Sequence, residues 1–257
     1  MGQGVDQGWL NKIASTVPGF PADKYGVYGE VAIVPALALA EYPPKLSYQE
    51  GTSIWMQYLT AYGALIMHGA IQKGDYVLIT AASSSVGTAA IEIAKAEGAI
   101  SIAATRTSTK KAELLALGAD HVVASEEEDL AGRVREIADG KGASLIFDPV
   151  GGAGFPNLLA AAALNATIFE YGALSMAPAT ISLLDVVRKH LVIRGYTLFE
   201  VVTNPGAFTQ AKHYVFDHLA AGTFKPRIDK TFPLSQIVEA HRYMESNQQI
   251  GKIVVTV

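Results

Sequence analysis

Residues 82–87 read ASSSVG and combine three serine hydroxyls with a backbone that small side chains leave accessible. A turn of this kind between a buried strand and a helix N-terminus gathers backbone N–H groups that can hydrogen-bond to phosphate oxygens. Ala82, Ser84 and Gly87 stand at the three glycine positions of the dinucleotide-binding pattern G-x-G-x-x-G. Only the third is glycine, but the first two are small enough for close approach of a pyrophosphate. We therefore predict a phosphate site with the hydroxyl donors Ser83, Ser84 and Ser85; a serine-rich turn that only caps the helix is the alternative.

A second group of donors stands where the next strand is expected to end, namely Thr105, Arg106 and Ser108, followed by Lys110 and Lys111. An NAD site usually has an acidic residue there for the ribose hydroxyls, and no Asp or Glu occurs in this stretch before Glu113. Because a planar guanidinium and hydroxyl groups suit a 2′-phosphate, we expect NADP(H) rather than NAD. The alternative is that Ser108 caps a helix beginning near Thr109 and that the cations only face water.

The elements that must position these donors alternate along the chain. Residues 77–80 are an apolar run typical of a strand buried on both faces, residues 88–97 have the apolar side of a helix, and residues 99–104 form the next strand. Further strands are predicted at 121–123, 144–147, 167–171 and 192–196, with helices at 129–138, 155–164, 181–189 and about 205–220. Six strands with helical crossovers predict the α/β class and a doubly wound parallel sheet of the Rossmann kind, whose ligand lies at the C-terminal ends of the strands.

The two ends of the chain do not follow this alternation. The first 45 residues carry five prolines around short β-prone runs such as 31–34, which favours part of an irregular β domain. From about residue 224 we expect a strand at 228–232, a helix at 234–246 and a final strand at 252–257. Three segments are therefore predicted: 1–45, a nucleotide-binding domain over 46–223, and 224–257.

Composition is that of an enzyme-like globular protein and excludes several classes of function. The 257 residues are 50% hydrophobic and 17% charged, with a net charge of −4 and no patch of basic and aromatic residues, so we expect no nucleic-acid partner. No apolar run approaches the roughly 18 residues of a membrane span, and the N-terminus lacks a signal-peptide pattern, so a cytoplasmic location is expected. The chain has no cysteine, and its six histidines are scattered, so we expect no metal site.

Several spaced motifs together resemble one family. The segments TAASSSVGTAAIEIAK, ALGADHVV, FDPVGG, EYGALS and IGKIVVTV are similar to the medium-chain dehydrogenase/reductase superfamily, in particular its zinc-independent, zeta-crystallin-like quinone oxidoreductases. The usual turn of that family is AASGGVG, of which AASSSVG is a variant. The resemblance implies a nicotinamide-nucleotide domain between two pieces of a GroES-like β domain, which accounts for the irregular ends, and it implies that most of the N-terminal GroES-like half is not part of this sequence.

The resemblance also implies roles for individual residues. Thr60 would lie near the nicotinamide, residues 83–87 around the pyrophosphate, Arg106 and Lys111 at the 2′-phosphate, and Gly172 and Ala173 beside the ring-side ribose. The implied cofactor-binding set is Thr60, Ser83, Ser84, Ser85, Val86, Gly87, Thr105, Arg106, Lys111, Gly172 and Ala173. Alcohol dehydrogenase relatives have a zinc-binding cysteine four residues before that threonine, where this chain has Met56, a poor ligand for catalytic zinc.

The expected function is therefore an NADPH-dependent oxidoreductase that transfers hydride to a quinone or an α,β-unsaturated carbonyl without metal. No catalytic side chain is assigned. Four tyrosines are either proton donors and substrate-wall residues or part of the core, namely Tyr25, Tyr28, Tyr58 and Tyr62. A nucleotide-binding protein or fragment without turnover, acting as a binding or interaction module, is the alternative. By resemblance, we also expect a homodimer that pairs through the edge of the sixth strand, residues 192–196, and the TLFEVVT segment after it.

Overall fold

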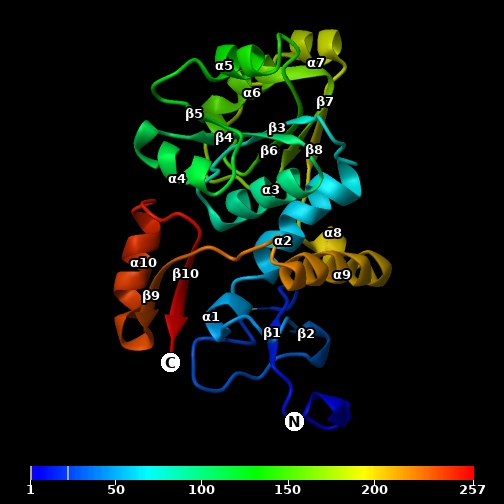
Figure 1. Ribbon diagram of the computed structural model, residues 1–257, viewed down its shortest axis with the longest axis vertical. Helices are drawn as coiled ribbons and strands as arrows, with labels where there is room; N and C mark the ends of the chain where they lie inside the picture. Colours follow the sequence, from blue (N-terminus) through cyan, green and yellow to red (C-terminus); the bar gives the residue numbers. More distant parts are fainter. Residues whose placement is uncertain (1, 22) are drawn as a thin grey trace.

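A six-stranded parallel sheet dominates the computed structural model, which describes residues 2–21 and 23–257. Its strands are β3 (Tyr76–Ile79), β4 (Ile100–Thr105), β5 (His121–Ala124), β6 (Ala143–Asp148), β7 (Ala162–Glu170) and β8 (Val192–Gly195). They lie in the order β5-β4-β3-β6-β7-β8, so the chain crosses between β5 and β6 and the order reverses at β3. This is the predicted doubly wound Rossmann sheet, and its upper position in the molecule is visible in Figure 1.

Helices cover both faces of this sheet because alternate strand residues point to opposite sides. Val77 and Ile79 pack with the buried residues of α2 and α3, whereas Leu78 packs with those of α5 and α6. The helices around the sheet are α2 (Trp55–Tyr62), α3 (Ser85–Ala96), α4 (Lys111–Ala116), α5 (Leu130–Ile137), α6 (Phe155–Ala161), α7 (Leu183–Lys189), α8 (Phe199–Val202) and α9 (Pro205–Ala221). A π-helix, η3 (Gly63–His68), continues α2.

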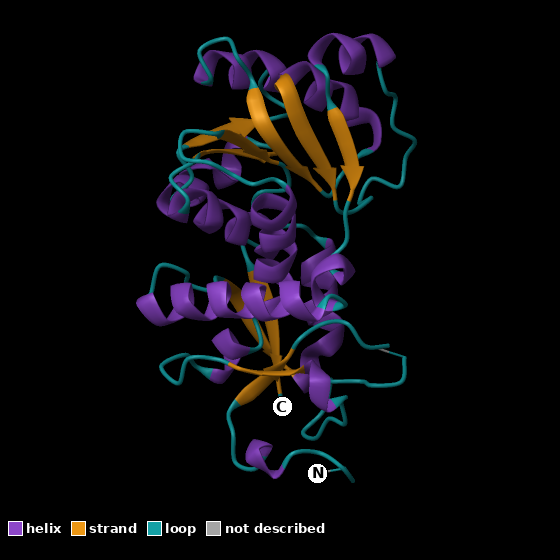
Figure 2. Ribbon diagram, turned by 90° about the vertical axis from the view of Figure 1, so that its right-hand side faces the viewer, coloured by secondary structure: helices purple, strands orange, loops and turns teal. Residues whose placement is uncertain are grey.

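The ends of the chain form two small sheets below the large one (Figure 2). Strands β1 (Ala14–Thr16) and β2 (Leu39–Glu41) pair antiparallel, followed by the single-turn helix α1 (Tyr48–Gly51). Strands β9 (Ile228–Pro233) and β10 (Lys252–Thr256) pair parallel and are joined through α10 (Ile237–Glu245). None of the helices in the described part of the chain combines the length and hydropathy needed to span a bilayer.

Three local predictions were wrong. The helix expected at 155–164 ends at Ala161, and β7 begins with the next residue; no glycine or proline marks this boundary in the sequence. The β-prone run 31–34 forms no strand and exposes Val31 and Ile33 almost fully. The TLFEVVT segment does not extend the sheet edge but contains α8, which buries Val201 completely.

Candidate functional site

The predicted phosphate turn lies directly between β3 and α3. Ser84 is the N-cap of α3, and its hydroxyl oxygen accepts a hydrogen bond from the backbone N–H of Gly87 at 3.0 Å. Helix α3 begins at Ser85, three residues before the predicted start, so Ser85 and Val86 form its first turn. Their backbone N–H groups therefore stand at the N-terminus of a long helix, where an anion is favoured.

Gly87 is required here by space. A Cβ at this position would lie 2.6 Å from the backbone oxygen of Ala82, closer than real Cβ contacts come. Ala81 adopts a left-handed conformation with φ of 43°, which is uncommon for a residue with a side chain. The turn is thus tight against the start of the helix, as the dinucleotide-binding pattern requires.

The C-terminal segment closes over this turn, which the sequence alone did not indicate. The backbone N–H of Gly251 donates to the carbonyl oxygen of Ser83 at 2.9 Å. The ammonium of Lys110 donates to Ser83 Oγ at 3.1 Å and to the carbonyl oxygens of Asn247 and Gln249, each at 2.7 Å. Lys110 therefore reaches the phosphate turn, and burial together with the nearby Arg106 lowers its pKa.

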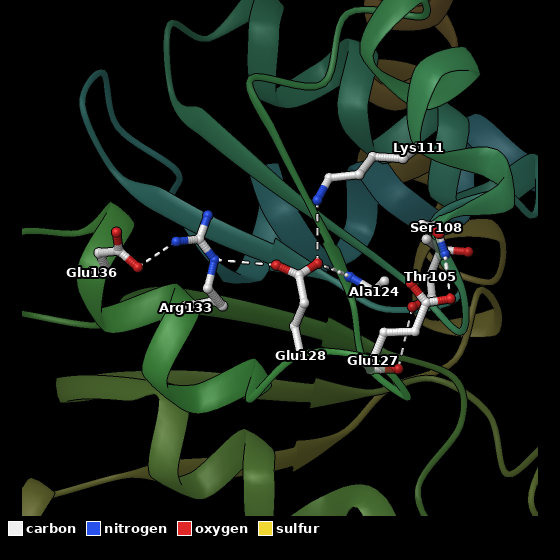
Figure 3. A network of polar contacts seen from close by, with 9 residues as sticks. Thr105, Ser108, Lys111, Ala124, Glu127, Glu128, Arg133 and Glu136 are labelled. Atoms are coloured by element: carbon white, nitrogen blue, oxygen red, sulfur yellow. Dashed lines mark hydrogen bonds and ion pairs between the residues drawn. The ribbon is translucent and has the colours of Figure 1, made fainter.

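The second group of predicted donors lies at the end of β4, where acidic side chains from another loop also gather (Figure 3). Lys111 forms an ion pair with Glu128 at 3.2 Å, and the backbone N–H of Ser108 donates to Glu127 at 3.0 Å. Thr105 is buried and Arg106 is exposed. Thr105, Arg106 and Ser108 thus stand at and just after the end of β4, but Lys111 is paired with Glu128 and the carboxylate of Glu127 lies beside Ser108.

Ser108 does not cap a helix through its side chain. It opens a short 3₁₀ turn, η4 (Ser108–Lys110), that leads into α4, and neither element has a side-chain cap. The acidic residues near this turn come from the β5–α5 loop, about twenty positions further along the chain. An inspection limited to the few residues that directly follow β4 could not have found these acidic residues.

A pair of buried polar side chains lies where the strand order reverses, at the C-terminal ends of β3 and β6. Thr80, next after β3, donates its hydroxyl to Asp148, the last residue of β6. The other carboxylate oxygen of Asp148 accepts the backbone N–H of Gly151 at 2.7 Å. Asp148 is 1% exposed, so this pair of donors holds a buried carboxylate at the switch point of the sheet.

Glu170 ends β7 directly beside Asp148, and burial and the Asp148 charge raise its pKa to about 8. Its Oε1 atom is buried without a hydrogen-bond partner, as are the hydroxyl of the adjacent Tyr171 and Oε1 of Gln249. Burial raises the pKa of Tyr171, whose ring stacks on Phe147 at 3.9 Å between centroids. Because buried polar atoms normally have a partner, these three atoms are free to hydrogen-bond to a bound water or ligand.

Glycines line the rest of this edge. Gly151 and Gly152 have φ of 61° and 65°, values that favour glycine, and a Cβ on Gly172 would lie 2.8 Å from the carbonyl oxygen of Pro149. Gly172 and Ala173 are exposed beyond the end of β7, at the edge where the ligand of such a sheet binds.

The side chains of Thr60 and of two of the four tyrosines are buried and make contacts within the protein. The Thr60 hydroxyl, in α2, donates to the carbonyl oxygen of Met56 at 2.5 Å, and the residue is 6% exposed. Tyr58 is completely buried, stacks on Phe224 and donates to Glu92 at 2.6 Å. Tyr62 packs in the same core. Among the described residues, no group of three or more His, Cys, Asp or Glu could hold a metal ion.

Comparisons with known proteins agree with this geometry. Residues 117–255 match the family model described as zinc-binding dehydrogenase. The chain is 29% identical over 234 residues to 2-haloacrylate reductase of Burkholderia sp., covering 90% of this chain and 70% of that protein.

Two solved structures are similar as well. The NADPH complex of Escherichia coli quinone oxidoreductase has a TM-score of 0.78 at 26% identity, covering 86% of this chain and 69% of that one. An NAD-dependent alcohol dehydrogenase has a TM-score of 0.82 at 32% identity, covering 90% and 65%. Because the matched family model covers more than half of the sequence, the chain belongs to the zinc-binding dehydrogenase family, within the medium-chain dehydrogenase/reductase superfamily that includes the quinone oxidoreductases.

Proposed function

We propose that this chain binds NADP(H) and acts as an oxidoreductase that reduces a quinone or an α,β-unsaturated carbonyl without metal. The observation that carries the proposal is the phosphate turn at the head of α3, flanked by unpartnered polar atoms at the switch point of a Rossmann sheet. The 2-haloacrylate reductase and the NADPH-bound quinone oxidoreductase among the similar proteins support both the cofactor and the substrate class.

The residues present fit a nicotinamide dinucleotide. The N-terminus of α3 offers backbone N–H groups to a pyrophosphate, and Arg106, with Thr105 and Ser108, offers donors to a 2′-phosphate. Gly172 and Ala173, together with the orphaned Glu170 and Tyr171 atoms, are proposed to meet the nicotinamide half. When bound, NADPH supplies the hydride; the chain orients the cofactor and excludes water around it.

The acid beside Ser108 makes the choice of cofactor testable. Glu127 accepts the Ser108 N–H, and an acid near this place is typical of NAD sites, whereas the exposed Arg106 is suited to meet a phosphate. NADPH and NADH dissociation constants from fluorescence titration decide the matter. Tighter binding of NADPH supports the proposal, and equal affinity for both nucleotides overturns the NADP(H) assignment.

The proposal of metal-free chemistry rests on the donor set of the chain. There is no cysteine, and Met56, at the place of the zinc-binding cysteine of alcohol dehydrogenase relatives, is 45% exposed. Elemental analysis after purification without added metals should find far less than one zinc per chain. One tightly bound zinc per chain would contradict it.

We propose further that residues 1–45 and 224–257 are parts of a GroES-like domain, and that the protein is a cytoplasmic homodimer joined along β8. The edge strand exposes Val192, and the neighbouring α7 exposes Leu183, Leu184 and Val187, so an apolar surface continues the unpaired edge. A turnover assay with NADPH and a quinone or enone separates the enzyme from a nucleotide-binding module, because the module would bind NADPH and leave the acceptor unreduced.

A further inference from the structure

The carboxyl groups of Asp148 and Glu170 form an unequal pair. The two residues are register partners at the ends of the neighbouring strands β6 and β7. Asp148 receives hydrogen bonds on both oxygens, from the hydroxyl of Thr80 and from the N–H of Gly151. Glu170 receives none that would do the same, and its Oε1 is buried without a partner.

The geometry therefore places one proton on this pair. A carboxylate at Glu170 would face the Asp148 charge with no donor between them, whereas a protonated Glu170 becomes a donor toward Asp148. Burial and the Asp148 charge raise the pKa of Glu170 to about 8. The protonated form thus prevails at neutral pH.

No other charged group among the described neighbours of Glu170 offsets the repulsion between its carboxylate and that of Asp148. On the β8 side, Glu170 is paired in register with Gly195, and its carbonyl oxygen accepts the backbone N–H of Tyr196. The ionisable groups of that region, Arg194, Glu200 and His68, are bonded to one another. On its own strand end, the neighbouring titratable group is the hydroxyl of Tyr171, whose pKa is raised by burial and by Asp148.

We propose that the nicotinamide half of the cofactor binds only while the Asp148–Glu170 pair holds one proton, which makes Glu170 a positioning residue that couples nucleotide affinity to pH. This inference rests on the NADP(H) function proposed above. In a doubly wound sheet, β3, β4 and β5 form one mononucleotide half and β6, β7 and β8 the other, so the pair belongs to the half away from Arg106.

The reason for the coupling is electrostatic. A second ionised carboxylate at the ends of β6 and β7 repels an anionic dinucleotide and competes with it for donors. In its acid form, Glu170 gives its O–H to Asp148 and keeps the orphaned oxygen as an acceptor. Ribose hydroxyls and the carboxamide N–H are the donors that a nicotinamide nucleotide carries for such an acceptor.

The test compares NADPH with 2′,5′-ADP, which lacks the nicotinamide half, at pH 7 and pH 9. For the wild type, NADPH should bind roughly tenfold more weakly at pH 9, because the free pair has lost its proton there, while 2′,5′-ADP affinity should stay constant. Glu170→Gln, a neutral isostere of the acid form, should bind NADPH equally at both pH values. Glu92→Gln, which changes a distant buried carboxyl, should keep the wild-type pH dependence.

A measurement on the unaltered protein makes the test independent of the variants. Titration calorimetry in buffers of different ionisation enthalpy should show uptake of about one proton per NADPH at pH 9 and almost none at pH 7. Wild-type NADPH affinity that is constant from pH 7 to 9, or an equal loss in Glu170→Gln, overturns the inference. Failure of both NADPH and 2′,5′-ADP to bind at any pH would instead reject the proposed function.

Discussion

The ammonium of Lys110 lies 3.1 Å from the hydroxyl oxygen of Ser83, although 27 positions separate the two residues in the chain. Lys111, its neighbour in sequence, points instead to Glu128. Of these two adjacent lysines, Lys110 therefore contacts the phosphate turn, whereas Lys111 forms an ion pair with Glu128.

Replacing Lys110 should accordingly weaken nucleotide binding more than replacing Lys111. Lys110→Met removes a cation at the turn and should raise the NADPH dissociation constant about tenfold, as loss of one charge-assisted contact would. Lys111→Met is the matched control, because it removes the same charge one position away. Fluorescence titration measures both, and a larger effect of Lys111 would refute the assignment.

Arg106→Ala tests the 2′-phosphate directly. The variant should lose about 1.5–3 kcal/mol of NADPH binding free energy and little of NADH binding, because only NADPH carries the phosphate that the guanidinium would meet. The same titration with both nucleotides gives the comparison. An equal loss for the two would mean that Arg106 acts on a part they share.

Gly87→Ala should destabilise the fold at the site itself. The added methyl would meet the backbone of Ala82 at 2.6 Å, and backbone cannot give way as a flexible side chain can. We expect a loss of about 1–3 kcal/mol in the free energy of unfolding, measured by urea denaturation. Gly154→Ala is the control, since a Cβ there meets no atom within 4 Å; equal stability of both variants would show that the turn is not tightly packed.

Glu92→Gln should change how stability depends on pH. Burial raises the pKa of Glu92 to about 7 in the folded protein, so its protonated form is favoured there more than in the unfolded chain. The stability that this provides is complete below the ordinary carboxyl pKa and is lost as pH rises toward 7.

The glutamine variant escapes that loss. The difference in unfolding free energy between the glutamine variant and the wild type should therefore shift in favour of the variant from pH 4 to pH 8, by up to about 3 kcal/mol. Thermal unfolding across this range measures the difference, with Glu245→Gln on the exposed surface of α10 as the control. A constant difference at all pH values would contradict a raised pKa.

Val192→Lys tests the proposed dimer. A lysine on an exposed edge strand opposes pairing with another strand, so the variant should shift the mass in light scattering toward the monomer and leave NADPH binding unchanged. Leu164→Lys replaces a similarly exposed apolar residue on β7 and should leave the mass as it is. A monomeric wild type at tens of micromolar would reject the dimer. Val201→Pro, the change that a continued edge strand would suggest, is unsuitable because Val201 is buried in α8.

The sequence predicted those features that depend on neighbours along the chain. The central strands β3, β4 and β6 are largely buried apolar runs, and the phosphate turn is contiguous, so both could be recognised from local patterns. The junction of α6 and β7 could not, because alanines on both sides suit either element. The β propensity of TLFEVVT was likewise misleading, since Phe199, Val201 and Val202 all lie in α8, where the burial of Val201 favours the helix.

The parts of the site that were missed are brought together only by the tertiary fold. Gln249 and Glu127 reach the turn and the end of β4 from distant segments, and no local pattern marks either residue. Asp148 and Glu170 end the neighbouring strands β6 and β7, so their proximity follows from the sheet order, but their unequal hydrogen bonding does not. Prediction from sequence thus placed the turn between β3 and α3, whereas the hydrogen bonds and charges around it are seen only in the structure.

The bond from Gly251 to Ser83 has a consequence for synthesis. The partner of the phosphate turn is made about 170 positions after the turn itself, which at usual elongation rates means a delay of roughly 10–30 s. During that interval β3 and α3 can form while the turn between them lacks its cover. The nucleotide site is therefore completed only after all six strands of the sheet that carries it have been made.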